Sequence, residues 1–202
     1  MKAVSPTFAF TGMHPRPHQR PPPPLGLPPS PDDVAGALAD CGWRQLERDA
    51  GPRLRRTGRG RIDINGIAKG FTVDLVMAAL RQHGIHHALV EIGGELAGRG
   101  VKPDGSPWWT SIDRPRTGLA PDVPPPLLVA LHNLAIATSG CERAYERGGR
   151  HYSHTIDSRT GMPIDNGMVS ATVLHPSCMD ADAYATDRKS TRLNSSHLGI
   201  SR

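Results

Sequence analysis

Residues 170–188 read SATVLHPSCMDADAYATDR, an apolar, β-branched run that passes into an acidic, alanine-rich one. The first part is typical of a buried strand, and DADAYAT (180–186) predicts a helix. On a helix, Asp182 and Thr186 lie four residues apart on one face, where a carboxylate and a hydroxyl can both point at a hard cation. An acid near a helix start also serves the macrodipole or a cap, so the pair alone leaves both roles open.

Four earlier segments share one pattern, an apolar and β-branched run interrupted by glycine and a few polar residues. This pattern is typical of strand ends that build a site. The segments are RIDINGIAKGFTVD (61–74), ALVEIGGELAGRG (88–100), LAIATSG (134–140) and RHYSHTIDSRTGMPI (150–164). Together with residues 170–186, and in this order, they resemble the ApbE family, the FAD:protein FMN transferases. The resemblance covers roughly residues 30 to 187.

Hydrophobic periodicity predicts a mixture of helices and strands. One short amphipathic helix is expected from residue 31 to about Gly42, and another over 71–84, with an apolar face made of Val73, Val76, Met77 and Leu80. GIAKG (66–70) is expected to be a tight turn. Strands are expected at 61–65, 86–93, 108–113, 151–157 and 168–176, with one or two more in 127–140. This order contains no regular βαβ repeat, so an α+β fold is predicted, and the resemblance implies an ApbE-like, T-fold-like domain.

Composition divides the chain into three parts. Residues 1–30 are rich in proline and are expected to be extended or disordered. Residues 31–187 are expected to form a partial ApbE-like domain, because the resemblance implies a longer chain that begins with strands and flavin-contacting residues not found in this sequence. Residues 188–202 are polar and patternless, so we expect an appended, adapter-like tail, the alternative being a genuine mobile tail.

Several classes of function are disfavoured by composition. The formal charge is +5, but the arginines are scattered among acids rather than aligned with aromatic residues, so no nucleic-acid partner is expected. Cys41, Cys141 and Cys178 stand far apart and show no zinc spacing. No signal-peptide pattern and no membrane-spanning apolar run is visible.

The resemblance implies transfer of the FMN half of FAD to a threonine hydroxyl of an acceptor protein, with release of AMP. Such a displacement needs a divalent cation, a proton acceptor and groups that hold the pyrophosphate. Mg²⁺ accepts few protein oxygens beside phosphate oxygens. The expected ligands are the Asp182 carboxylate, the Thr186 hydroxyl and, by the resemblance, the backbone carbonyl of Ala68, which a glycine-flanked turn would leave outside regular pairing.

Further positions match motifs that contact the flavin nucleotide in the family. Lys69 is expected to bind phosphate, although an exposed lysine at a helix start can also be solvated surface. Asn65 and Phe71 are expected beside FAD, with a core position as the alternative for Phe71. His154 is expected to accept the threonine proton or to contact the pyrophosphate, unless it is a structural histidine. Ile156 is expected to contribute through its backbone.

The resemblance also implies a setting for the reaction. The partner would be an acceptor flavoprotein with a target threonine, such as a subunit of a respiratory redox complex. The location would be periplasmic or at the inner membrane of a bacterium. Two other readings stay open: an FAD pyrophosphate hydrolase or flavin-binding relative, and an inactive fragment.

Overall fold

The computed structural model describes residues 8–11, 29–60, 62–112, 126–140 and 145–190. These residues divide into two compact units. The first contains those within 1–14, 64–142 and 166–202, and the second contains those within 15–63 and 143–165. No helix within the described ranges is both long and apolar enough to cross a membrane.

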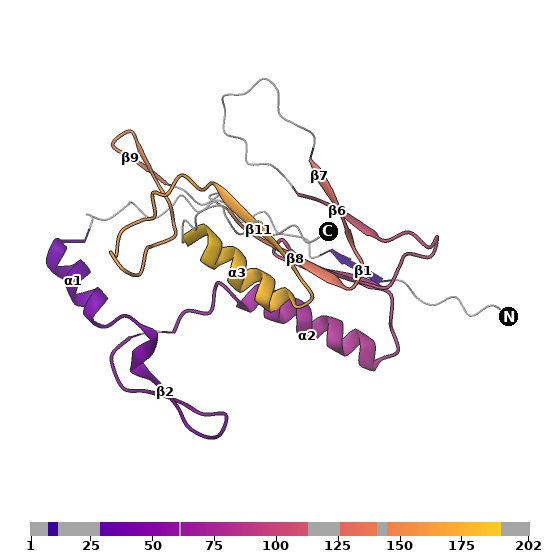
Figure 1. Cartoon of the computed structure of the whole chain (residues 1–202), viewed down its shortest axis with the longest axis horizontal. Coiled ribbons are helices and arrows are strands. Elements are labelled where there is room, and N and C mark those ends of the chain that lie inside the picture. Colours follow the sequence, from indigo (N-terminus) through magenta and orange to yellow (C-terminus); the bar gives the residue numbers. More distant parts are fainter. Residues whose placement is uncertain (1–7, 12–28, 61, 113–125, 141–144, 191–202) are drawn as a thin grey trace, which may run out of the picture. The chain divides into compact units, whose positions relative to one another are not determined.

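The first unit is built on a five-stranded mixed sheet with the order β1-β4-β5-β8-β11 (Figure 1). β1 pairs parallel with β4, and every other neighbouring pair is antiparallel. The strands are β1 (Phe8–Thr11), β4 (Ala88–Ile92), β5 (Glu95–Arg99), β8 (Leu134–Gly140) and β11 (Ser170–His175). The turn from β4 to β5 consists of Gly93 and Gly94, with φ of 63° and 97°. Positive φ at both residues suits a two-residue hairpin turn, which places Glu95 at the start of β5.

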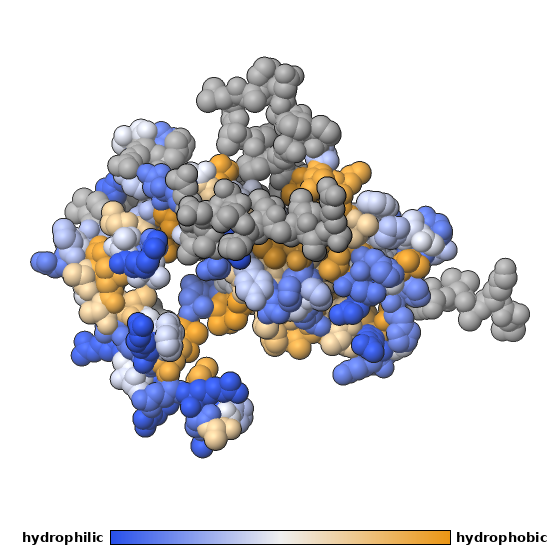
Figure 2. Space-filling model, in the orientation of Figure 1, coloured by the Kyte–Doolittle hydropathy of each residue, from blue (hydrophilic) through white to orange (hydrophobic). Residues whose placement is uncertain are grey.

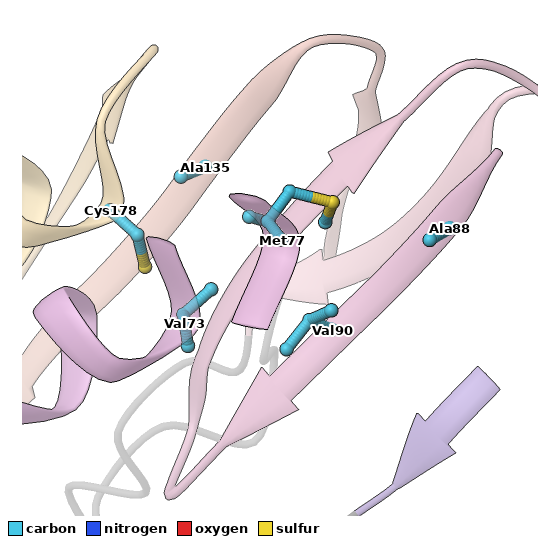
Figure 3. Close-up of a cluster of buried hydrophobic side chains, with 7 residues drawn as sticks. Val73, Met77, Ala88, Val90, Ala135 and Cys178 are labelled. Carbon is cyan, nitrogen blue, oxygen red and sulfur yellow. The ribbon is translucent and has the colours of Figure 1, made fainter. Parts of the chain in front are cut away.

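Two helices, α2 (Ala68–Gln82) and α3 (Cys178–Ser190), cover one face of this sheet (Figure 1). Val73 and Met77 lie one turn apart on α2 and are both buried. They pack against alternate residues of the strands, as the two-residue period of a strand requires. Figure 3 shows this cluster, which contains Val73, Met77, Ala88, Val90, Ala97, Ala135 and Cys178.

A two-stranded hairpin covers the opposite face of the sheet. It consists of β6 (Trp108–Ile112) and β7 (Leu127–Leu131). Trp108 and Leu131 are buried with Ile136 of β8, and the Trp108 indole N–H donates to the Arg99 carbonyl at 2.9 Å. A Cβ built on Gly98 would lie 2.6 Å from the Leu131 carbonyl oxygen, so only glycine allows the hairpin to approach β5 this closely.

The second unit has less regular structure. It contains α1 (Pro31–Ala39), the 3₁₀ turn η1 (Trp43–Gln45), and the antiparallel pairs β2 (Leu46–Arg48) with β3 (Leu54–Arg56) and β9 (Tyr145–Arg147) with β10 (Arg150–Tyr152). Ser30 and Asp33 form a capping box at the start of α1. Val34 and Leu38 of α1 lie against Gly161, which confirms the apolar face expected for this helix.

Most predicted elements are confirmed. α1, α2 and α3 form where periodicity placed helices, and β4, β6, β7, β8 and β11 lie within the expected strands. The α+β fold is therefore confirmed. Within the proline-rich segment 1–30, Phe8–Thr11 nevertheless form β1, and the rest of 1–28 lies outside the described residues.

Three expectations about elements are wrong. The strand expected at 61–65 is absent from the described residues 62–64, and GIAKG contains the first turn of α2. Of the strand expected over 151–157, only residues up to Tyr152 are in β10, followed by an isolated bridge between Ile156 and Pro163. α3 continues to Ser190, so the first three residues of the segment 188–202 are helical, and the tail expected there stays a prediction.

Candidate functional site

The N-terminal ends of α2 and α3 are joined by hydrogen bonds to carboxylates of the opposite helix. Asp74 of α2 accepts from the Ser177 hydroxyl and from the backbone N–H groups of Cys178 and Met179, each at 3.0 Å. Asp74 therefore caps α3, since these donors have no partner within their own helix.

Asp182 of α3 makes the reciprocal contact. Its side chain is 5% exposed, and its Oδ2 accepts from the Gly70 N–H in the first turn of α2 at 3.1 Å. A Cβ on Gly70 would lie 2.2 Å from the Cys178 carbonyl oxygen and 2.9 Å from the Asp182 Cβ, so the helices touch at this glycine. Asp182 is thus a buried acid whose position both helices determine.

Ala68 lies in the first turn of a helix and not in an open turn, whereas its role as a ligand stays a prediction. Ala68 is the first residue of α2, and its carbonyl accepts from the Thr72 hydroxyl at 2.8 Å. Gly66 instead lies against Thr186, because a Cβ on Gly66 would be 3.3 Å from the Thr186 Oγ1. The Gly70 N–H, which a continuing helix would direct to the Gly66 carbonyl, goes to Asp182. Within the part of the chain that is described, no hydrogen bond reaches the Gly66 carbonyl.

Lys69 is paired with an acid that sequence reasoning missed. Its ammonium lies 2.5 Å from Oε1 of Glu95, a residue that is 1% exposed. The other carboxylate oxygen, Oε2, is buried and has no hydrogen-bond partner among the described residues. Burial, opposed by Lys69, raises the pKa of Glu95. The available signal was a charged residue at the inward-facing start of an apolar strand.

Phe71 and Asn65 are exposed beside this region. Phe71 is 47% exposed and lies on the outer side of α2 with Ile67 and Leu75, so it does not belong to the core. Figure 2 shows hydrophobic residues along this side of α2. Asn65 precedes Gly66 and has an interaction within the structure.

His154 and Ile156 belong to the second unit, both on its surface. They precede a compact turn in which Asp157 accepts from the Arg159 backbone N–H and guanidinium at 2.7 to 2.9 Å. These bonds lower the pKa of Asp157 to about 2. The structure therefore brings Asp182, Thr186 and Lys69 together around the start of α2, and describes His154 and Ile156 in a separate unit.

A separate hollow of about 510 Å³ lies beside the start of α3. None of the site residues predicted from the sequence lines it. Its lining residues are Asp74, Met77, Ala78, Arg81, Gln82, Arg99, Pro176 and Ser177.

The donor set near α2 suits a hard cation better than a soft one. One carboxylate, one hydroxyl and one carbonyl are oxygen donors, as Mg²⁺ prefers. The described residues contain no group of three or more His, Cys, Asp or Glu that could hold a metal ion. A site that keeps most positions for phosphate and water needs only one carboxylate, so Asp182 with Thr186 and a backbone carbonyl at the start of α2 fits such an ion.

These features define an α+β domain with an oxygen-lined site where the N-terminal ends of two helices meet. The ApbE family model matches residues 3–188, and the chain belongs to the ApbE family.

Relatives agree with this assignment. The chain is 44% identical over 126 residues to the FAD:protein FMN transferase of Vibrio cholerae serotype O1, covering 62% of this chain and 37% of that one. It is 34% identical over 163 residues to the enzyme of the same name from Haemophilus influenzae, covering 78% and 46%. The crystal structure of Pseudomonas stutzeri flavinyl transferase ApbE matches with a TM-score of 0.71 and 39% identity, covering 80% and 49%. The chain thus spans half or less of the length of these relatives.

Proposed function

We propose that this chain contributes the cation and phosphate side of a site that transfers FMN from FAD to a threonine of an acceptor protein, releasing AMP. The observation that carries the proposal is that Asp182 and Thr186 both lie against the start of α2, Asp182 at Gly70 and Thr186 at Gly66. The names of the relatives, FAD:protein FMN transferases, support the reaction class.

The proposed ligands of Mg²⁺ are Asp182, Thr186 and a backbone carbonyl at the start of α2. The Ala68 carbonyl is the proposed backbone ligand. The Gly66 carbonyl is the alternative, because Gly66 lies against Thr186 and no hydrogen bond reaches its carbonyl among the described residues. A bound Mg²⁺ would neutralise charge that develops on the phosphates. Lys69 supports the same phosphates with its ammonium, whose side chain is 44% exposed.

His154 is the proposed proton acceptor for the threonine, with Ile156, Asn65 and Phe71 beside the flavin nucleotide. His154 is exposed, and an imidazole titrates near neutral pH, so it suits proton transfer from a hydroxyl. The proposed acceptor is a flavoprotein of a respiratory redox complex, and the proposed location is the periplasm or the inner membrane. An FAD pyrophosphate hydrolase is the second candidate, because water can take the place of the threonine hydroxyl.

The test is covalent flavin fluorescence on a threonine-containing acceptor protein incubated with this chain, FAD and Mg²⁺. Asp182→Asn should reduce transfer by roughly 100-fold or more, because it removes the one charged ligand while an amide oxygen can still accept from Gly70. Asp187→Asn changes an exposed carboxylate of the same helix and should leave transfer unchanged. Normal transfer by Asp182→Asn would contradict the cation site.

Two further readouts refine the assignment. Thr186→Val should weaken Mg²⁺ dependence less than Asp182→Asn does, because water can replace a neutral hydroxyl, and Thr186→Ser should restore it. Free FMN and AMP without labelled acceptor would identify the hydrolase instead of the transferase.

A further inference from the structure

Glu95 occupies a position that stability alone does not explain. Its carboxylate is 1% exposed, with Oε1 paired to Lys69 at 2.5 Å and Oε2 without a donor among the described residues. An unsatisfied buried acceptor destabilises the folded state, and more so when it is charged. Well-packed apolar residues of similar size often stabilise a protein as well as a buried ion pair does, or better.

The surroundings of Glu95 add to this cost. Its own raised pKa has burial as the largest cause, and the Asp182 carboxylate raises it further. Among the described residues, Lys69 is the cation that acts on this pKa in the opposite direction. The Lys69–Glu95 ion pair therefore lies beside a second buried acid, Asp182, which makes it unfavourable for stability. This cost suggests that the Lys69 ammonium has a function at this position.

The turn between β4 and β5 leaves room for the Lys69 side chain. A Cβ on Gly93 would lie 3.0 Å from the Lys69 Cδ and 3.8 Å from the Glu95 Oε2. Lys69 precedes Gly70, whose N–H bonds to Asp182. Glu95, the first residue of β5, thus binds the ammonium on one side. The Lys69 side chain is still 44% exposed to solvent, at the same end of α2 as Asp182.

We propose that Glu95 is a positioning residue, which holds the Lys69 ammonium so that its remaining N–H donors face the diphosphate of a dinucleotide ligand. An ammonium has three donors, and Glu95 accepts from one of them, so donors remain for phosphate oxygens. This inference rests on the proposed function for the nature of the ligand, and on the observed ion pair for the position of Lys69.

The first experiment needs no ligand. In a ¹H–¹⁵N spectrum of lysine ammonium groups, Lys69 should give a resolved signal because Glu95 protects it from exchange with water. Glu95→Gln should remove that signal. Lys189, which is buried and donates to the Gly140 carbonyl, provides the internal control and should keep its signal in both proteins. An unchanged Lys69 signal in Glu95→Gln would overturn the positioning role.

The second experiment compares FAD with riboflavin, which lacks phosphate, by flavin fluorescence in the presence of EDTA. Glu95→Gln and Lys69→Met should each weaken FAD binding by about 10-fold and leave riboflavin binding unchanged. Equal losses for both flavins, or none, would overturn the inference.

A double variant separates positioning from stability. Lys69→Met with Glu95→Leu should melt no lower than the wild type, because neither member of the ion pair is left buried without its partner, yet it should lose the preference for FAD over riboflavin. A lower melting temperature would mean that the pair serves folding. If the wild type fails to bind FAD, the proposed function and the diphosphate role fall together, while the lysine signal still reports whether Glu95 holds Lys69.

Discussion

The Asp182 carboxylate has two roles, as a helix cap and as a proposed cation ligand. One oxygen accepts from the Gly70 N–H, so part of its role is the helix cap that a sequence reader would assign to an acid at this place. Its partner, however, belongs to another helix, and that exchange leaves the Gly66 carbonyl without its helical donor. The cap and the alternative backbone ligand of the proposed cation site are therefore consequences of one hydrogen bond.

Cys178 provides a prediction at the scale of one residue. It is fully buried, and burial together with Asp74, Glu95 and Asp182 raises the pKa of its thiol to about 12. Since the thiolate is the reactive form, iodoacetamide at pH 8 should leave Cys178 unmodified in the folded chain. Cys41 is exposed and should react under the same conditions.

Peptide mass spectrometry measures both sites and separates them from Cys141, which lies outside the described residues. Unfolding in urea should expose Cys178 and make it react like Cys41. Rapid modification of Cys178 without denaturant would show that the start of α3 opens readily.

At the scale of elements, hydrophobic periodicity predicted the helices and strands that have a regular apolar face. It missed elements whose residues are explained by contacts with other elements. α2 shows its buried stripe in the sequence, and β4 and β8 show apolar runs. β5 was missed because a glutamate starts it and Gly98 interrupts it, and both residues serve contacts with other elements. The same limit applies to the proposed site, since the motif order indicated Asp182, Thr186 and Lys69 but not Glu95, whose partner Lys69 lies 26 residues earlier in the chain.

Gly70 and Gly36 form a matched pair of helical glycines. Gly70→Ala should destabilise the first unit by about 1–3 kcal/mol, because its Cβ would meet the Cys178 backbone and force α2 from α3. Gly36→Ala should stabilise α1 by about 0.5–1 kcal/mol, because nothing lies within 4 Å of its Cβ.

Hydrogen exchange measures both effects helix by helix. Exchange should become faster in α2 and α3 in the first variant and slower in α1 in the second. Unchanged protection of α2 and α3 in Gly70→Ala would contradict the close approach of the two helices.

Asp74 tests the reciprocal cap. Asp74→Ala removes the acceptor for three donors at the start of α3, so we expect a loss of about 2 kcal/mol in the free energy of unfolding. Asp74→Asn retains an acceptor oxygen and should recover part of that loss. Urea titration followed by circular dichroism gives both values, and equal stability of Asp74→Ala and the wild type would refute the cap.

At the scale of the whole molecule, the residues singled out from the sequence fall into two compact units, each described by itself. Asp182, Thr186 and Lys69 belong to the first unit, whereas His154 and Ile156 belong to the second. The order of the family motifs along the chain is the observation that groups these residues in one proposed site. Long-range contacts such as that of Asp74 with the start of α3 are independent of spacing in the sequence, so periodicity alone could not predict them.

The end of α3 allows the last prediction, which concerns where the folded chain stops. Residues 188–190 continue the helix, and Lys189 is fully buried, donating to the Gly140 carbonyl at 2.5 Å. Its own carbonyl accepts from Asn166 at 2.8 Å, and the Ser190 hydroxyl donates to the Thr186 carbonyl at 2.8 Å. A chain that ends at Asp187 loses all three bonds, and with them the anchor of α3 on the end of β8.

We therefore expect truncation after Asp187 to lower the melting temperature by about 5 °C, since a loss near 1 kcal/mol shifts a domain of this size by several degrees. A chain that ends at Ser190 keeps every one of these contacts and should melt with the full-length protein. Differential scanning calorimetry of the three chains measures this. Equal melting of all three would mean that the last turn of α3 contributes nothing, and that the folded part stops where composition first placed the tail.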